Sequence, residues 1–141
     1  MLLMGFNFEK IGVERMKDTV DKLSVDTNID VLDVREIKTD ILSDKETLLQ
    51  AKFSYVVKYD PGFAKIEING SVLFAVDEKE AKEILKEWKK KELPEDFRVT
   101  FFNIVLKKAA LRSLHLEEEM NLPLHIPLPT IRPDEDKKKG K

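Results

Sequence analysis

The residues that could do chemistry are few, and their spacing matches no catalytic set. The chain has two histidines, His115 and His125, and no cysteine, so thiol catalysis, disulfides and cysteine metal sites are excluded. No carboxylate lies at a recognisable metal-ligand spacing from either histidine, and we interpret both as surface or packing residues. The serines lack a nucleophile-elbow context, and there is no glycine-rich phosphate loop. The sequence therefore predicts a protein that is not an enzyme and that holds no metal or cofactor.

The charged residues are numerous but balanced in sign. They make up 37% of the 141 residues, with 25 Lys plus Arg against 27 Asp plus Glu. The net charge of -2 argues against nucleic acid as the main partner, because nucleic-acid binding usually needs a dominant basic field. Carboxylates alternate with lysines, as they do on solvated faces. Abundant Lys and Glu together with few thermolabile residues predict a thermophile protein.

The apolar runs are short. The N-terminal run, residues 1–6, has no preceding cation and is too short for a signal peptide. No other run approaches the roughly twenty apolar residues that a membrane span needs. We therefore expect a cytoplasmic protein without membrane insertion.

The elements that must position these residues begin with strands. Alternation of apolar and polar residues predicts a mostly antiparallel meander, and Asp60-Pro61-Gly62 has the composition of a turn. The alternation continues through Asn69-Gly70, so we predict one long strand with a bulge or close backbone approach at Gly70. The predicted strands are a short one at 6–8, then 29–38, 49–59 and 63–76, with 13–23 weakly helical at best and 39–46 a loop.

Helices are predicted after the last strand. Asp77 with Glu80 forms a capping-box pair, the apolar spacing up to Trp88 is helical, and Pro94 ends this helix. We predict a second helix over 100–119, although 97–106 can also be read as a strand. Its apolar residues cover a wide arc, which predicts contact with both the sheet and a second subunit. The sequence thus predicts one α+β domain over 1–133, with a four-stranded antiparallel sheet and helices on one face, and a charged, disordered tail over 134–141.

An apolar arm, residues 121–130, follows the second helix. Its three prolines, at 123, 127 and 129, rule out a helix and make a poor central strand, so the arm must run extended. We expect its alternate aliphatic side chains to lie against the domain and hold the arm there, each contributing roughly 1.5–3 kcal/mol. Those side chains are Leu122, Leu124, Ile126 and Leu128.

The order of parts resembles the SecB export chaperones. Four strands, a helix that opens with residues 102–106 (FNIVL) and carries 109–112 (AALR), and an extended 121–124 (NLPL) follow that family's pattern. The resemblance covers residues 6–130 by order of elements and is specific over about 100–129. It implies a cytoplasmic holdase that binds unfolded chains without ATP. Two departures are a longer, more charged helix over 77–92 and a lysine-rich tail in place of an acidic one, so a translocase motor or a toxin–antitoxin pair both stay open as partners.

The resemblance also implies where the surfaces lie. The arm would lie beside the sheet and form a hydrophobic client-binding groove with sheet aromatics, and the protein would be a homodimer or homotetramer that assembles through its first strand and main helix. The predicted groove residues are Phe53, Tyr55, Phe74, Leu122, Leu124, Ile126 and Leu128. The predicted interface residues are Phe6, Phe8, Leu111 and Leu114.

Two other functions are compatible with the sequence. One is a structural or adaptor homo-oligomer whose apolar surfaces are all covered by its own assembly. The other is a small nucleic-acid-binding α+β domain, which the near-neutral charge disfavours. A chaperone should suppress client aggregation without nucleotide, whereas a closed homo-oligomer should not. A nucleic-acid-binding domain should show strongly salt-dependent binding.

Overall fold

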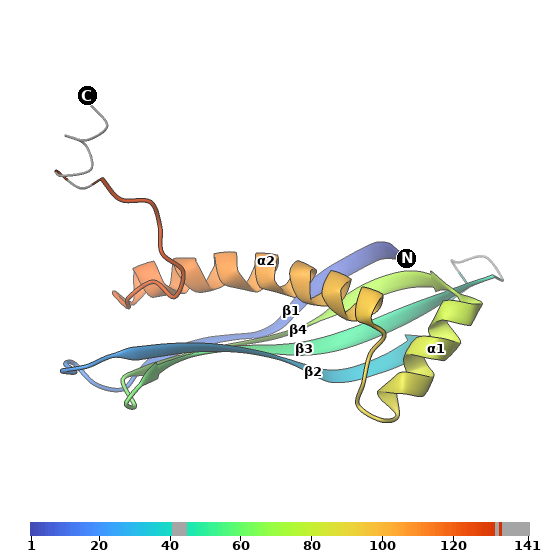
Figure 1. Ribbon diagram of the computed structural model, residues 1–141, viewed down its shortest axis with the longest axis horizontal. Coiled ribbons are helices and arrows are strands. Elements are labelled where there is room, and N and C mark those ends of the chain that lie inside the picture. The colour runs from blue at the N-terminus through green and yellow to red at the C-terminus, as the bar shows by residue number, and fades with distance from the viewer. Residues whose placement is uncertain (41–44, 132, 134–141) are drawn as a thin grey trace.

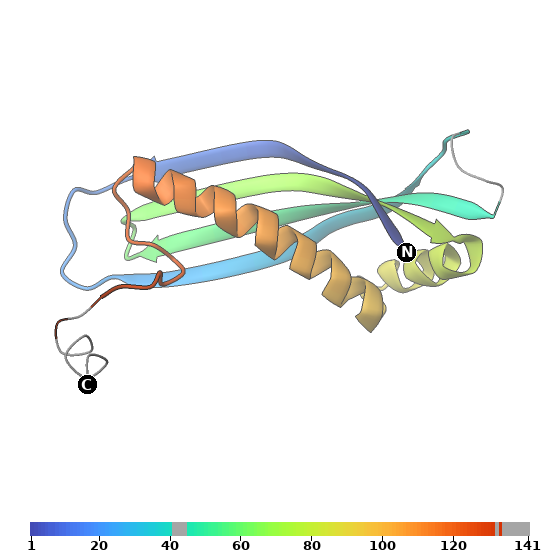
Figure 2. The ribbon, with the colours of Figure 1, turned by 90° about the horizontal axis from the view of Figure 1, so that it is seen from above.

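The computed structural model describes residues 1–40, 45–131 and 133, and these form an α+β fold. The strands are β1 (Leu2–Arg15), β2 (Ser24–Ile37), β3 (Glu46–Asp60) and β4 (Ala64–Asp77), and the helices are α1 (Glu78–Trp88) and α2 (Glu95–Glu119). The four strands form one antiparallel sheet in the order β1-β4-β3-β2. Helix α2 lies over one face of the sheet, and α1 packs at the end where β4 finishes (Figures 1 and 2). The predicted fold class is confirmed.

The connectivity differs from a simple meander. Strands β2, β3 and β4 follow one another across the sheet, but β1 pairs with β4 on the far edge. The connection between β1 and β2 therefore crosses the end of the sheet, as Figure 2 shows. Residues 16–23 form this connection and contain no helix, and Val13 to Arg15 belong to β1. The weak helical reading of 13–23 was wrong because alternation of Ile11 and Val13 continues the strand.

The core lies between α2 and the sheet. Alternate residues of the two inner strands point toward α2 and are buried, because each inner strand has a neighbour on both sides and a helix above. On α2 the buried residues Phe97, Phe101, Val105 and Ala109 recur at every fourth position, which is helical and not strand spacing. Helix α2 therefore begins at Glu95, five residues before the predicted start, and the strand reading of 97–106 was wrong. The buried sheet residues are Leu49, Ala51, Phe53, Tyr55, Val57 and Tyr59 on β3, and Ala64, Ile66, Ile68, Val72, Phe74 and Val76 on β4.

Gly70 lies in the middle of the unbroken β4, opposite Phe53 on β3 and Phe8 on β1. A Cβ atom at this position would meet the Asn7 carbonyl oxygen and would lie 2.7 Å from the Phe53 ring. The ring of Phe53 thus packs directly on the glycine backbone. The predicted long strand with a close approach at Gly70 is confirmed, and the register shifts by one residue beside it, between Phe8 and Lys10.

Local signals set the turns and helix ends. The Asp77 carboxylate accepts a hydrogen bond from the Glu80 N–H at 2.7 Å, so the predicted cap of α1 is confirmed. Gly62 has a positive φ of 53° in the turn that joins β3 and β4. The predicted loop at 39–46 falls partly on residues 41–44, outside the described residues, and β3 already begins at Glu46. The predicted tail, 134–141, also lies outside the described residues.

In the described part of the chain, neither helix is long and apolar enough to cross a membrane.

Candidate functional site

A cleft opens between β2, the connection from α1 to α2, and the first half of α2. Its volume is about 470 Å³. Ile29 and Val31 form its floor on β2, and Trp88 and Phe102 contribute aromatic walls from the two helices. All four side chains are half-buried, so they offer apolar surface to the solvent. The cleft is lined by Ile29, Asp30, Val31, Trp88, Lys91, Glu92, Leu93, Arg98 and Phe102.

The end of α1 shapes the aromatic wall of this cleft. Lys91 adopts a left-handed conformation with φ 62°. Its N–H donates to the Trp88 carbonyl oxygen at 2.8 Å, and the Glu92 N–H donates to the Glu87 carbonyl oxygen at 3.1 Å, which is a Schellman closure of the helix. The Lys91 Nζ lies 4.5 Å above the centre of the Trp88 ring, so a cation–π contact keeps the indole at the cleft edge.

The arm begins with a second Schellman closure, at the end of α2. Asn121 takes a left-handed conformation with φ 53°, its N–H donates to the Glu118 carbonyl oxygen, and the Leu122 N–H donates to the Glu117 carbonyl oxygen at 2.8 Å. Leu122 is buried, as the residue after such a closure commonly is. The arm then runs on without helix or strand, which is consistent with its prolines, but it bends at His125 and Ile126, so the expectation of an extended arm holds only for part of it.

A buried polar network fastens the arm to the sheet and to α2. The Glu117 carboxylate is fully buried and accepts the His125 Nδ1–H at 2.8–2.9 Å and the His125 backbone N–H at 3.2 Å. His125 Nε2 lies 2.8 Å from the Tyr55 hydroxyl. The Tyr59 hydroxyl lies 2.7 Å from Glu117 Oε2 and 2.6 Å from the Pro123 carbonyl oxygen, so its proton is shared between two acceptors.

Burial next to a carboxylate disfavours ionised tyrosine. The pKa of Tyr55 is raised to about 12, first by desolvation and then by the charge of Glu117. The pKa of Tyr59 is raised further, by desolvation, by its hydrogen bond to Glu117 and by the same charge. Both hydroxyls therefore remain hydrogen-bond donors across the neutral range.

The structure separates the predicted groove residues into two groups. Phe53, Tyr55 and Phe74 are buried below α2, where Phe74 contacts the ring of Phe97 at a centroid distance of 5.2 Å. On the arm, Leu122 is buried, but Leu124, Ile126 and Leu128 are 39%, 39% and 52% exposed. Of the four aliphatic side chains expected to hold the arm, only Leu122 is thus fully packed, and the other three are partly exposed. The ring of His125 takes the inward position instead, because its two nitrogens satisfy Glu117 and Tyr55. A role of these residues in client binding stays a prediction.

The predicted interface residues lie on two elements, β1 and α2, and Phe6 among them is half-buried, with its ring 5.5 Å from that of Phe53. Phe6 and Phe8 are on β1, an edge strand, with their rings 5.0 Å apart. Leu111 is 57% exposed on the outer side of α2, and Leu114 is half-buried beside it. Further apolar side chains are exposed on the same two elements: Leu2, Leu3, Met4 and Ile11 on β1, and Val99 and Leu106 on α2. Assembly through these surfaces stays a prediction.

Sequence reasoning missed both the cleft and the polar network. Trp88 was interpreted as helix core, and Ile29 and Val31 only as strand residues. Glu117 carried one usable signal in the sequence: it is a carboxylate that continues the i+4 series of Phe97, Phe101, Val105 and Ala109. A buried carboxylate needs donors, and His125 is one of few available in the following segment.

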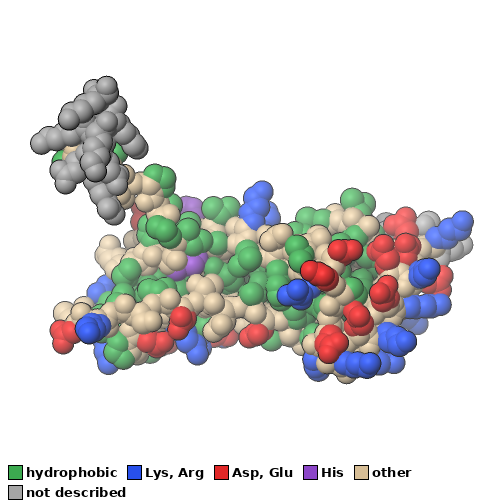
Figure 3. Space-filling model, in the orientation of Figure 1, with side chains coloured by type: hydrophobic (Ala, Val, Ile, Leu, Met, Phe, Trp, Pro, Cys, Tyr) green, Lys and Arg blue, Asp and Glu red, His purple; other side chains and the backbone are tan. Residues whose placement is uncertain are grey.

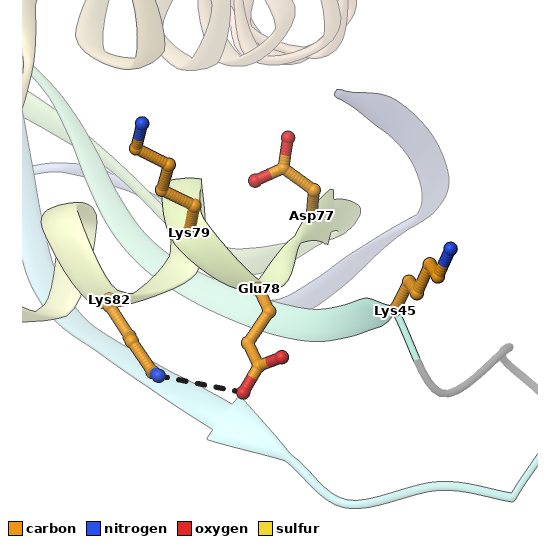
Figure 4. Close-up of a pocket in the computed structure, with 5 residues that line it drawn as sticks. All are labelled: Lys45, Asp77, Glu78, Lys79 and Lys82. Atoms are coloured by element: carbon orange, nitrogen blue, oxygen red, sulfur yellow. Dashed lines mark ion pairs between the residues drawn. The ribbon is translucent and has the colours of Figure 1, made fainter.

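Another hollow does not form a site. Lys45, Asp77, Glu78, Lys79 and Lys82 line an open depression beside the start of α1 (Figure 4). Glu78 pairs with Lys82 at 3.5 Å, one turn apart on an exposed helix face, and Figure 4 marks no other ion pair among the five side chains. Among the described residues no group of three or more His, Cys, Asp or Glu side chains could hold a metal ion.

The apolar and charged surfaces are segregated. Figure 3 shows hydrophobic side chains gathered between the sheet, α2 and the arm, whereas lysines and carboxylates gather around α1. The apolar side of α2 therefore carries the cleft at one end and the arm at the other.

Comparisons with known proteins agree with this geometry at the level of the fold. No family model and no curated protein matches the sequence. Among solved structures, a SecB-like chaperone of Mycobacterium tuberculosis, in complex with a ChAD peptide from the HigA1 antitoxin, is similar with a TM-score of 0.52 and 11% sequence identity. The similarity covers 93% of this chain and 91% of that one. The chain therefore has a SecB-like fold.

Proposed function

We propose that this protein is an ATP-independent chaperone, a holdase that binds unfolded or precursor polypeptides on the α2 side of its sheet. The observation that carries the proposal is the half-exposed apolar cleft beside α2, on a SecB-like fold. An unfolded chain offers scattered apolar side chains, and Trp88, Phe102 and Val31 can bury them without a fixed sequence. The antitoxin peptide bound to the structural neighbour supports a polypeptide ligand.

The predicted groove extends this surface along the helix. In the proposal, Leu124, Ile126 and Leu128 of the arm supply further exposed aliphatic surface at the other end of α2. Phe53, Tyr55 and Phe74 support this surface from below, because their rings are buried between α2 and the sheet. The client contacts are apolar, so the function requires no cofactor, metal or nucleic acid.

The proposed working form is a cytoplasmic homodimer or homotetramer. The edge strand β1 and the outer side of α2 both expose apolar side chains, among them Phe8 and Leu111. Exposed patches of this kind mark interaction surfaces. The same observation favours the second candidate, a structural or adaptor homo-oligomer in which assembly covers all of this surface.

An aggregation assay separates the two candidates. A reduced or heated test protein is incubated with a molar excess of this protein, without nucleotide, and light scattering is recorded. The chaperone should suppress scattering, whereas a closed oligomer should leave the curve unchanged. Replacement of Phe102 and Val31 by Ser in the cleft should weaken suppression, and replacement of Leu73, half-buried on the opposite face of the sheet, serves as the matched control.

A further inference from the structure

The arm is held by its main chain as well as by one side chain. The Tyr59 hydroxyl contacts the Pro123 carbonyl oxygen, and Glu117 Oε1 accepts the His125 backbone N–H. These two groups are separated by one residue, and the chain bends at His125 and Ile126. The His125 ring fills the remaining place between Glu117 and Tyr55. Tyr55, Tyr59 and Glu117 therefore form a seat, and the arm segment 123–125 occupies it.

The chemistry of the seat is not specific to the arm. Every peptide offers a carbonyl oxygen at the first position, and every residue except proline offers an N–H two positions later. Besides this carbonyl oxygen and this N–H, the seat requires a side chain that donates a hydrogen bond to the buried Glu117 carboxylate. His, Lys and Arg side chains can do so. An Asp or Glu side chain would place a second carboxylate beside Glu117, and that repulsion is unfavourable in a buried site.

The arm can leave this seat without unfolding α2. The helix end is fixed independently, by the Schellman closure at Asn121 and by Arg15, whose guanidinium donates to the Met120 carbonyl oxygen at 3.3 Å. Beyond the buried Leu122, the aliphatic side chains of the arm are already exposed by more than a third. Release would expose the covered part of these side chains, and water can replace the lost hydrogen bonds.

We propose that the arm is a displaceable occupant of this seat and that an extended client segment with a His, Lys or Arg side chain takes its place. This inference rests on the proposed function and names a class of polypeptide that the α2 surface prefers. Displacement adds Tyr55, Tyr59 and Glu117 to the client-binding surface. It therefore gives polar selectivity at one end of an otherwise apolar surface.

Peptide binding to the full chain tests the proposal. The probe is a fluorescein-labelled peptide with the sequence of residues 121–130, and the proteins are the wild type and the His125→Ala variant. Fluorescence anisotropy should show tighter binding to the variant, because its own arm has lost the ring that competes for the seat. Peptides with the His125→Asp or His125→Pro change should bind the variant about tenfold more weakly, which corresponds to about 1.4 kcal/mol.

Equal affinities for the three peptides would overturn the proposal, because binding would then not use the seat. Failure of the His125→Ala variant to fold would also overturn it, since a displaceable arm cannot be required for folding. The wild type gives a separate check, because the chain has only two histidines. An excess of the unchanged peptide should move the NMR signal of the His125 ring and leave that of His115 in place.

The peptide-binding and aggregation assays together distinguish a failure of the seat proposal from a failure of the proposed chaperone function. Equal peptide affinities together with suppressed aggregation would refute the seat and leave the chaperone function standing. Selective peptide binding without any suppression of aggregation would refute the chaperone function and leave the seat standing.

Discussion

The carboxylate of Glu117 and the imidazole of His125 lie 2.8 Å apart, and both side chains are almost completely buried. They join the last turn of α2 to the arm, and Tyr55 and Tyr59 join the pair to β3. One buried acid thus connects three parts of the chain that are distant in sequence. Because Glu117 accepts hydrogen bonds from His125, the side of the arm that carries His125 faces inward.

Replacement of Glu117 by Ala should destabilise the fold by about 1–3 kcal/mol, because it leaves a buried imidazole and a tyrosine hydroxyl without their acceptor. The free energy of unfolding, measured with urea, checks this expectation. Glu118→Ala is the matched control, since the neighbouring Glu118 is exposed and its loss should change stability by less than about 0.5 kcal/mol. Equal effects of the two changes would show that the network contributes nothing.

Stability should fall steeply above pH 10 because of the two buried tyrosines. The pKa of Tyr55 is raised to about 12 in the folded state, so below pH 10 tyrosine is protonated in both states and contributes no pH dependence. Above pH 10 the unfolded chain loses these protons first, and each tyrosine lowers stability by about 1.4 kcal/mol per pH unit until its folded pKa is reached. Urea unfolding between pH 9 and 11.5 should show a shallower slope for Tyr55→Phe, and an unchanged slope would contradict this account.

Gly70→Ala should destabilise the protein by about 1–3 kcal/mol through overpacking. The added methyl group would meet the Phe53 ring at 2.7 Å and the Asn7 carbonyl oxygen, so either the ring or the β1 pairing must move. Thermal unfolding checks the prediction. The control is Gly12→Ala on β1, opposite Glu67, where the nearest heavy atom is 3.9 Å away and no loss is expected. An unchanged unfolding temperature for Gly70→Ala would contradict the close packing of Phe53 and Asn7 on Gly70.

A charge at Leu111 should dissociate the proposed oligomer and leave the single chain folded. Leu111 is 57% exposed in the chain itself, so Leu111→Glu introduces a buried charge only where a second subunit covers α2. Sedimentation at micromolar concentration should show a smaller species for this variant. Leu32→Glu, at a similarly exposed aliphatic residue on the edge strand β2, should sediment as the wild type does. A wild type that sediments as a monomer would refute the assembly.

The elements could be predicted from the sequence where a local pattern determines them. Period-two alternation located β3 and β4, and Asp77 with Glu80 located the start of α1, because these signals act within a few residues. The start of α2 was misplaced because Phe97 and Phe101 fit a strand as well as a helix until the sheet beneath them is known. The position of β1 beside β4 is a long-range pairing, and no local residue specifies it.

The candidate site was less predictable, for a physical reason. Alternation in the arm indicated that Leu122, Leu124, Ile126 and Leu128 share one side, and apolar burial alone would turn that side inward. The observed orientation, with His125 inward, follows from Glu117. Hydrogen bonds to its buried carboxylate stabilise the arm more than further aliphatic contacts with the sheet would. Such a preference depends on a partner in another element, which the arm sequence alone does not reveal.

The central claim is that an unfolded chain binds on the α2 side of the sheet, and site-specific photo-crosslinking tests it most directly. A photoreactive residue is placed at Phe102 in the cleft, at Leu124 on the arm, or at Val56, which is half-buried on the opposite face of the sheet. Each protein is irradiated with a permanently unfolded, labelled polypeptide in the absence of nucleotide. We expect crosslinks from Phe102 and Leu124 and none above background from Val56. Equal crosslinking from Val56, or none from any position in folded protein, would contradict the central claim.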